Sequence, residues 1–341
     1  MSSKCSETTL HWHDARFLTV GGRGWTDVKG FFSRLPAKSE KTVLTEVWEL
    51  SQQSAGIYVG FSTDSGSISA RWTLLNEKLD GYVMSAIGAS GLDLYAQDGD
   101  EWRWLAVGIP RAKNAYADIV RGLPPGKRNY LLYLPLRNGV ESLEIGVDTQ
   151  AVPMPFTPFS GRPIVYYGTS IVHGEGASRP GMCHAAILGR RLKREVINLG
   201  FAGAGAMDVE IAQLMGEIGA AIYIIDCLPN MTAPVIEERT VQFVDALRSV
   251  RTDIPIVLVE DRTYANAWLI GNSYERHQAS RQALRDSYNR LIASGVSRLH
   301  YVEGEQLLDG DNEATVDGSH PSDLGYTHYA DALEAVLRRL L

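Results

Sequence analysis

The 341-residue chain has few cysteines and no long hydrophobic run. Cys5, Cys183 and Cys227 are odd in number and far apart, which is a poor framework for disulfides and suits a reducing compartment. No stretch approaches the ~18 uninterrupted apolar residues of a membrane-spanning helix. Residues 1–17 also lack the apolar core that a secretory signal needs. These absences predict a cytoplasmic protein that does not enter a membrane.

Clustered positive charge is also missing. The formal net charge is −7 and the pI is about 5.7, whereas a nucleic-acid surface needs a patch of lysine and arginine. The sequence contains no internal repeat, no low-complexity tract and no block of like charge. Its 45% hydrophobic and 21% charged residues are typical of a globular protein, and its length allows two domains of about 100–200 residues. We therefore expect a globular protein that does not bind nucleic acid.

The first part of the chain, residues 1–147, has the pattern of an all-β domain. Short runs with alternating, β-branched and aromatic residues are separated by polar, glycine-rich turns, which is typical of a sandwich or jelly roll. The Pro-rich stretch 148–162 predicts a linker. The expected strands are 45–50, 56–62, 67–75, 93–99, 101–108, 129–136 and 142–147.

After the linker, residues 163–341 alternate between strand-like and helical patterns. This alternation predicts a flavodoxin-like α/β domain, with a parallel five-stranded sheet flanked by helices. Ser322 or Asp323 is the expected N-cap of the last helix. Ligands of such sheets bind at the carboxyl ends of the strands, so the residues at those ends matter most. The expected strands are 163–168, 195–200, 220–226, 254–260 and 298–304, and the expected helices are 182–193, 207–218, 233–251, 274–295 and 322–341.

Polar residues at the strand ends suggest acyl transfer through a serine. Ser170 follows the first strand by two residues, and Asp317 and His320 lie in the loop before the last helix. A serine nucleophile needs a base, usually histidine, and that base needs a group that fixes its tautomer and stabilises its positive charge. We predict that Ser170 is the nucleophile, His320 the base and Asp317 its orienting carboxylate.

The same reaction needs donors for the developing oxyanion. The backbone N–H groups of Ser170 and Gly203, together with the side-chain amide of Asn230, are the predicted oxyanion hole. Gly203 follows the second strand and Asn230 follows the third, so both are expected at the same edge of the sheet as Ser170. Glycine at position 203 would allow close approach of the backbone to a substrate.

This arrangement resembles the SGNH (GDSL-like) hydrolase superfamily, whose marker residues Ser, Gly, Asn and His lie in separate blocks in that order. The matching blocks are YYGTSIVHGEGASRPGM, NLGFAGAGAMD, DCLPNM and DGSHPSDLGY, and the resemblance covers roughly residues 160–341. GLDLY, at 91–95, resembles the G-x-D-L-Y motif of a β-sandwich that precedes some SGNH domains. His173 and Glu175 make the block around Ser170 more charged than we expect for the subgroup with this β-sandwich. The resemblance therefore says less about which acyl group the pocket accepts.

The resemblance implies an esterase that removes a short acyl group, with acetyl expected, through an acyl-enzyme. Enzymes of this architecture often act on acetylated sugars, so the implied partner is a small-molecule ester such as an acetylated carbohydrate. No metal or cofactor is required. At least one relative acts in polyketide tailoring, so an acyltransferase or tailoring esterase remains an alternative. The sandwich is expected to pack over the site and shape the alcohol side of the substrate.

Four further residues are candidates for substrate binding, each with a structural alternative. His173 either lines the acyl pocket or is a surface or core histidine. Arg179 either reaches a substrate oxygen or forms a salt bridge. Tyr264 and Trp268, in a long loop at a strand end, either stack on a sugar ring or pack against the first domain.

Three other classes of protein fit less well. A nucleotide-binding protein would use GFAGAG, but its spacing is G-x-x-G-x-G rather than G-x-G-x-x-G. An α/β-hydrolase needs G-x-S-x-G, whereas Ser170 lies in G-T-S-I-V. A non-catalytic glycan-binding module leaves the complete catalytic set unexplained. The sequence does not decide the oligomeric state, and a homo-oligomer remains open.

Overall fold

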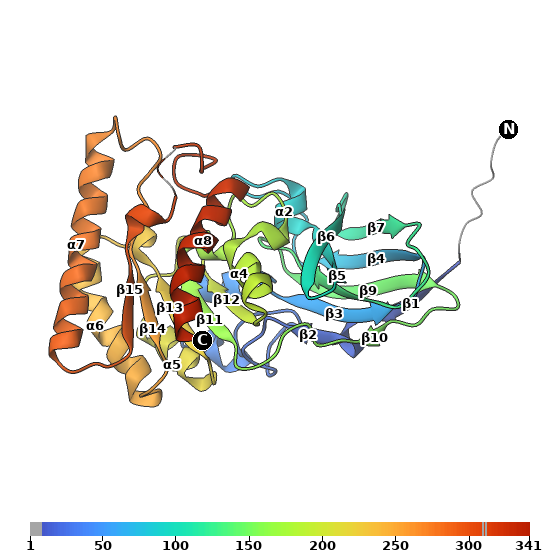
Figure 1. Ribbon diagram of the computed structural model, residues 1–341, viewed down its shortest axis with the longest axis horizontal. Coiled ribbons are helices and arrows are strands. Elements are labelled where there is room, and N and C mark those ends of the chain that lie inside the picture. Colours follow the sequence, from blue (N-terminus) through green and yellow to red (C-terminus); the bar gives the residue numbers. More distant parts are fainter. Residues whose placement is uncertain (1–8, 309, 311) are drawn as a thin grey trace.

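The protein, described here by a computed structural model over residues 9–308, 310 and 312–341, has two halves arranged along its long axis (Figure 1). An antiparallel β-sandwich comes first, and a parallel α/β half follows. Cys5 lies outside the described residues, and Cys183 and Cys227 are buried free thiols. No helix among the described residues is long and apolar enough to cross a membrane.

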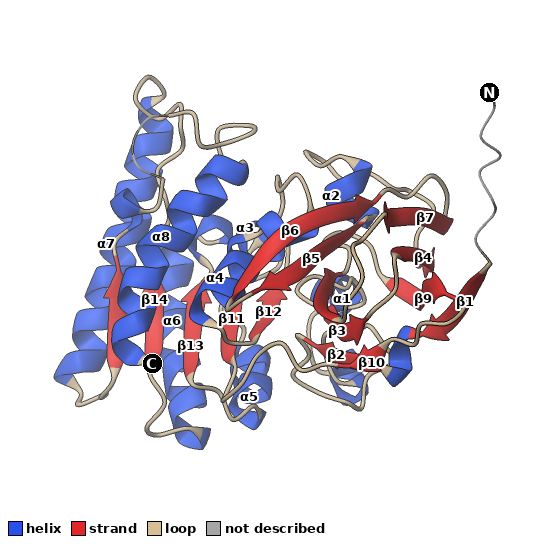
Figure 2. Cartoon of the chain, turned by 45° about the vertical axis from the view of Figure 1, so that its right-hand side comes forward, coloured by secondary structure: helices blue, strands red, loops and turns tan. Residues whose placement is uncertain are grey.

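The sandwich consists of two antiparallel sheets, which confirms the predicted class (Figure 2). Alternate residues of the strands, such as Val59, Phe61 and Trp72, form the core between the sheets. The first sheet has the order β1 (Leu10–Asp14), β9 (Val140–Asp148), β4 (Ser67–Leu74), β7 (Asn114–Arg121). The second has the order β10 (Met154–Pro155), β3 (Tyr58–Thr63), β8 (Arg128–Tyr133), β5 (Leu92–Asp98), β6 (Glu101–Gly108), and β2 (Thr19–Gly21) also pairs with β3.

Strand β8 ends in four consecutive buried residues, Tyr130 to Tyr133. Tyr130 and Leu132 point into the sandwich core, whereas Leu131 and Tyr133 belong to a second cluster with Ala186 of the α/β half. Both faces of the strand are therefore buried, one by the partner sheet and one by the other half of the molecule.

Three features of the first half differ from the prediction. Residues 45–50 were expected as a strand but form helix α1 (Thr45–Ser51). Val47 and Trp48 of this helix are buried in the core of the α/β half, so tertiary contacts override their strand propensity. Strands β2 and β7 were missed, and β10 pairs with β3 inside the expected linker 148–162. The boundaries 1–147, 148–162 and 163–341 stay a prediction.

The α/β half has a five-stranded parallel sheet of the predicted flavodoxin-like type. Tyr166 and Tyr167 of β11 face opposite sides of the sheet and belong to different core clusters. Helices α4 (His184–Leu192) and α8 (Asp323–Leu340) cover one side, and α5 (Val209–Glu217), α6 (Ala233–Val250) and α7 (Gly271–Ala293) cover the other. The strand order is β12 (Val196–Gly200), β11 (Ile164–Gly168), β13 (Ile222–Asp226), β14 (Ile256–Val259), β15 (Leu299–Val302).

Smaller elements lie in the connections. Ser322 caps α8, since its side chain accepts a hydrogen bond from the N–H of Gly325, so the first of the two predicted N-caps is the one used. Short α-helices are α2 (Ala86–Ser90) and α3 (Ser170–His173), and 3₁₀ helices span Ala15–Phe17, Ala37–Lys41, Pro180–Met182, Leu228–Asn230 and Gly304–Gln306.

The GLDLY motif connects the two halves. Asp93 Oδ2 accepts hydrogen bonds from Arg179 Nη1 and from the N–H of Gly181, both at 2.8 Å, and Oδ1 accepts one from Trp104 Nε1 at 3.0 Å. Arg179 Nη1 also donates to the hydroxyl of Tyr95 at 2.5 Å. The motif thus binds the loop between α3 and α4, which follows the predicted nucleophile.

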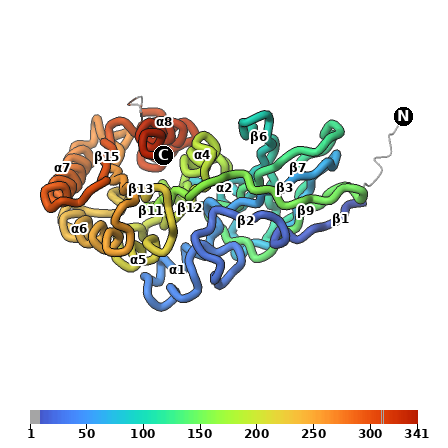
Figure 3. Tube along the Cα trace, turned by 60° about the horizontal axis from the view of Figure 1, so that its bottom comes forward, coloured from blue at the N-terminus to red at the C-terminus, as the bar shows by residue number. Residues whose placement is uncertain are grey.

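A second connection comes from the chain before β3, drawn in blue beside α5 in Figure 3. Trp25 and Trp48 lie in the core of the α/β half, and Trp25 Nε1 donates to Glu217 Oε2 at 2.9 Å. The buried Arg34 donates to the carbonyl oxygens of Asn198 and Gly200 in β12. The position of the sandwich relative to the parallel sheet is therefore fixed on two sides.

Candidate active site

Ser170 lies where strand β11 becomes helix α3. Gly168 ends the strand, and the hydroxyl of Thr169 accepts a hydrogen bond from the N–H of Ile171, which caps the short helix. This turn presents Ser170 at the carboxyl edge of the sheet, where its Oγ lies 2.9 Å from Nε2 of His320. The separation is within hydrogen-bonding distance of a serine and its base.

His320 is oriented by Asp317. Its Nδ1 lies 2.8 Å from Asp317 Oδ2, and the backbone N–H groups of Ser319 and His320 donate to Oδ1 at 2.9 and 2.7 Å. Because Nδ1–H faces a carboxylate, the neutral ring accepts at Nε2, the atom next to Ser170. Partial burial acts to raise the pKa of Asp317, but the hydrogen bonds and the neighbouring imidazole outweigh it, and the net pKa lies below the ordinary value of 3.8. Asp317 is therefore charged when it orients the base.

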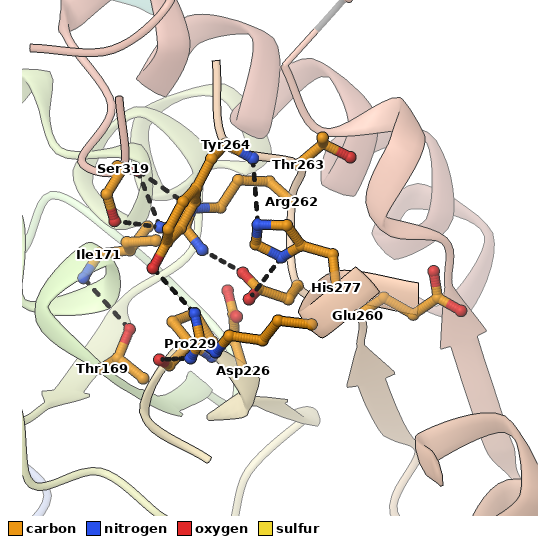
Figure 4. A network of polar contacts seen from close by, with 12 residues as sticks. Thr169, Ile171, Asp226, Pro229, Glu260, Arg262, Thr263, Tyr264, His277 and Ser319 are labelled. Carbon is orange, nitrogen blue, oxygen red and sulfur yellow. Dashed lines mark hydrogen bonds and ion pairs between the residues drawn. The ribbon is translucent and has the colours of Figure 1, made fainter. Parts of the chain in front are cut away.

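Arg262 binds Ser319, the residue before His320, and Figure 4 shows the two side by side. Its Nη2 donates to the carbonyl oxygen and the hydroxyl of Ser319 at 2.9 and 2.5 Å, and Nε donates to the same carbonyl at 3.1 Å. The guanidinium is buried and pairs with Asp261, which also lies 3.1 Å from Nδ1 of His277. Arg262 follows strand β14, so the sheet itself positions the loop.

Asn230 and Gly203 come from the ends of the two strands that flank β11. Asn230 ends a 3₁₀ helix after β13, and its Nδ2 donates to the carbonyl of Gly205 at 3.1 Å. Gly203 has φ +75° and open space where a Cβ would stand. Its requirement for glycine is therefore conformational rather than steric.

Arg276, on helix α7, supports this side of the site. Its Nη2 donates to the carbonyl of Pro229 at 2.8 Å, and its Nη1 donates to the hydroxyl of Tyr264 at 2.9 Å. Figure 4 labels the two partners, Tyr264 and Pro229. One side chain thus fixes the residue before Asn230 and the aromatic ring of Tyr264.

A cavity of about 380 Å³ brings these residues together. Among the predicted residues, Ser170, Gly203, Asn230, His320 and Tyr264 line it, and Asp317 lies behind His320. The size is that of a site for a small molecule. The remaining lining residues are Tyr82, Arg137, Glu175, Ala202, Pro229, Arg262 and Ser319.

Three of the predicted substrate-binding residues do not appear among the described residues that line the cavity. His173 is fully buried, and its ring nitrogens face Arg34 and Arg137. Arg179 forms the salt bridge with Asp93, which was the structural alternative considered for it. Trp268 is 75% exposed. The structure therefore gives His173 and Arg179 roles in packing and in joining the two halves.

The sequence did not single out Tyr82, Arg137, Glu175 or Arg262. Arg262 lies three residues after the end of strand β14, and its position after a strand end is a signal of the same kind as that of Asn230. Glu175 lies in the block around Ser170, where its charge was noted. Tyr82 and Arg137 belong to the sandwich, and no local pattern marks them as neighbours of Ser170. Within the described part of the chain, no three His, Cys, Asp or Glu side chains form a group that could hold a metal ion.

Comparison with known families agrees with this geometry. The GDSL-like Lipase/Acylhydrolase family matches residues 161–338. The chain belongs to this family. Residues 10–152 match the N-terminus of the Esterase_SGNH_hydro-type, which is named for the G-x-D-L-Y motif. A search of curated proteins found no match for the chain.

Solved structures resemble this GDSL-like acylhydrolase over both halves. A putative GDSL-like lipase from Bacteroides ovatus is 32% identical, with a TM-score of 0.94 over 97% of this chain and 98% of that one. The salicylyl-acyltransferase SsfX3 from a tetracycline biosynthetic pathway is 20% identical, with a TM-score of 0.77 over 97% of each chain. A family two carbohydrate esterase from Clostridium thermocellum, in complex with cellohexaose, is 16% identical, with a TM-score of 0.63 over 84% of this chain and 92% of that one. The last two likenesses show the shared fold.

Proposed function

We propose that this esterase-family protein removes a short acyl group, acetyl in the first instance, from a sugar or another small hydroxylated molecule. The observation that carries the proposal is the hydrogen-bonded chain Ser170–His320–Asp317 at a cavity also lined by Gly203 and Asn230. Such a chain activates a serine for attack on an ester carbonyl.

The reaction proceeds through an acyl-enzyme. Ser170 Oγ attacks the carbonyl carbon while His320 Nε2 takes its proton, and Asp317 stabilises the imidazolium. The N–H groups of Ser170 and Gly203 and the amide of Asn230 bind the oxyanion. His320 then protonates the leaving alcohol, and afterwards removes a proton from the water that releases the acid. The chemistry needs no cofactor.

Two observations support a small hydroxylated substrate. The cavity has room for a small molecule, and nine of its twelve lining residues have side chains with a polar group. Among the structures of the same fold are family two carbohydrate esterases. An acetylated carbohydrate is therefore the substrate class to test first.

The test compares hydrolysis of 4-nitrophenyl acetate and 4-nitrophenyl butyrate by the wild type and by Ser170→Ala. We expect turnover of the acetate, slower turnover of the butyrate, and loss of both in the variant. Full activity of Ser170→Ala would remove the nucleophile from the proposal. Faster turnover of the butyrate would remove the acetyl preference and leave the esterase.

Acyl transfer to an alcohol is the second candidate, favoured by the whole-length likeness to SsfX3. It uses the same acyl-enzyme and differs in whether water or an alcohol accepts the acyl group. Product analysis of 4-nitrophenyl acetate turnover in the presence of methyl xyloside distinguishes the two. Acetylated xyloside formed faster than free acetate would favour the transferase, and acetate alone would favour the hydrolase.

A further inference from the structure

A charged pair forms the wall of the cavity that faces the sandwich. Arg137 Nε lies 2.8 Å from Glu175 Oε2, and both residues line the cavity together with Ser170. Glu175 is only 3% exposed. Its other oxygen, Oε1, is buried and has no hydrogen-bond partner among the described residues. A buried carboxylate oxygen without a donor is costly, and such groups in native proteins call for an explanation.

Oε1 lies beside a turn of the sandwich that contributes to the cavity wall. A Cβ built on Gly81 would stand 3.4 Å from Oε1, so the oxygen lies beside the turn that carries Tyr82. Tyr82 itself lines the cavity and is 84% exposed. The unpartnered oxygen thus belongs to a cavity residue of the nucleophile's loop and lies next to the sandwich turn that precedes Tyr82.

Arg137 is held in place from behind. Its backbone N–H donates to the carbonyl of Ala89 at 3.0 Å, and its Nη1 lies 3.1 Å from Nδ1 of His173. Burial, and then the charges of Arg34 and Arg137, lower the pKa of His173 well below 6.5, so its ring is neutral and can accept from Arg137. Part of the Arg137 side chain, 21%, remains exposed. His173 is therefore a positioning residue for an arginine that faces the cavity.

We propose that Arg137 and Glu175 form a specificity subsite that binds a hydroxyl group next to the scissile ester, with Glu175 Oε1 accepting and Arg137 donating. The inference rests on the proposed esterase function and adds the feature of the substrate that is recognised. It also assigns the sandwich a direct part in recognition, because Arg137 follows strand β8.

The chemistry of the pair selects a neutral hydroxyl over other groups. A hydroxyl can donate and accept at the same time, so it satisfies both residues. An apolar group would leave Oε1 without a donor. An anionic group would face the carboxylate of Glu175, and a cationic group would face Arg137 with Arg34 close behind. Sites built to bind a hydroxyl discriminate strongly against analogues that lack it.

On the opposite wall of the cavity, the polar side chains already have hydrogen-bond partners within the protein. Pro229, Arg262 and Tyr264 come from the loops after β13 and β14, on the side of β11 away from β12 and the sandwich. Arg262 and Tyr264 already have protein partners there, Ser319 and Arg276. The unpartnered polar atom on the sandwich side therefore distinguishes the two walls.

A pair of esters that differ by one hydroxyl tests the proposal. We would measure kcat/KM for trans-2-hydroxycyclohexyl acetate and for cyclohexyl acetate, and take their ratio. This ratio does not depend on the fraction of folded enzyme. We expect the wild type to prefer the hydroxylated ester by about tenfold or more.

The variants then locate the preference. Arg137→Met/Glu175→Met replaces the pair with apolar side chains of similar size, a change that buried ion pairs often tolerate. Its ratio should fall to about 1. Glu175→Gln, which keeps the shape but loses the charge, should have an intermediate ratio, and it decides the matter if the double variant does not fold. Arg179→Met is the control, because it breaks another arginine–carboxylate pair between the halves away from the cavity, and its ratio should match the wild type.

The possible outcomes distinguish a failure of the proposed subsite from a failure of the proposed esterase function. Hydrolysis of 4-nitrophenyl acetate with a wild-type ratio near 1, or a ratio that survives in the double variant and in Glu175→Gln, would overturn the subsite and leave the esterase. A preference lost equally in Arg179→Met would also overturn it. Failure to cleave all three esters would overturn the proposed function, and the subsite would fall with it.

Discussion

The α/β half supplies its side of the cavity from strand ends, whereas the sandwich supplies its side from loops between strands that belong to another core. Ser170, Gly203 and Asn230 follow three adjacent parallel strands, so the sheet alone brings them together. Arg137 and Tyr82 reach the same cavity only because the two halves are docked. The proposed reaction chemistry therefore belongs to one fold, whereas the proposed recognition of the substrate depends on the interface between the two halves.

Loss of the base, a residue of the α/β half, should have the largest effect on activity. His320→Ala leaves Ser170 without a proton acceptor, and kcat for 4-nitrophenyl acetate should fall by about 10⁴-fold or more. Steady-state kinetics on protein with an unchanged circular dichroism spectrum is the measurement. A loss of less than about a hundredfold would mean that another group serves as the base.

Asp93, in the sandwich, should instead affect stability. Asp93→Ala removes the acceptor shared by Arg179, Gly181 N–H and Trp104, and it leaves a guanidinium unpaired at the interface. We expect the free energy of unfolding to fall by about 3–5 kcal/mol in urea titrations, while the folded variant keeps a kcat close to that of the wild type.

Lys38→Ala is the matched control for Asp93→Ala. Lys38 also pairs across the two halves, with Glu217 at 2.7 Å, but the pair is exposed, so its loss should change stability little. Equal destabilisation by the two variants would show that the buried Asp93 contacts stabilise the protein no more than an exposed ion pair does.

A second buried aspartate, Asp226 of the α/β half, should have the opposite effect on stability: its replacement should stabilise the protein, whereas replacement of Asp93 should destabilise it. Burial raises the pKa of Asp226 from 3.8 to about 7, although the hydroxyls of Tyr166 and Tyr329 donate to it. Between about pH 4 and pH 7 the folded chain holds a proton that the unfolded chain has lost, so stability falls as the pH rises, by up to about 4 kcal/mol.

Asp226→Asn should remove this loss. The variant should therefore gain in Tm relative to the wild type at pH 8 and gain little at pH 4, in thermal unfolding followed across that range. Parallel curves for the two proteins from pH 4 to pH 8 would contradict the raised pKa of Asp226.

At the oxyanion hole we expect a smaller loss of activity than for His320→Ala. Asn230→Ala should lower kcat by about 10²–10³-fold with a smaller change in KM, because the donor acts on the transition state. Tyr82→Ala, from the sandwich wall, should change KM more than kcat. The reverse assignment, with Tyr82 affecting kcat and Asn230 only KM, would break the division between chemistry and recognition.

The residues at the strand ends could be predicted from the sequence because the carboxyl ends of parallel strands meet at one edge of the sheet. Alternating elements predicted the sheet, and Ser170, Gly203, Asn230 and His320 were read from the ends. Helix α1 was read as a strand, because Val47 and Trp48 have strand propensities and the contact that buries them lies in the other half. Arg137 could not be found at all, since its place beside Glu175 depends on how the sandwich docks.

The central claim is that Ser170 is a nucleophile activated by His320. The most direct measurement is intact-mass and peptide mass spectrometry of the wild type, Ser170→Ala and His320→Ala after incubation with a 4-nitrophenyl alkylphosphonate. We expect one adduct on the wild type, located on Ser170, none on Ser170→Ala, and much slower labelling of His320→Ala. An adduct on another residue, or labelling of Ser170→Ala at the wild-type rate, would contradict the claim.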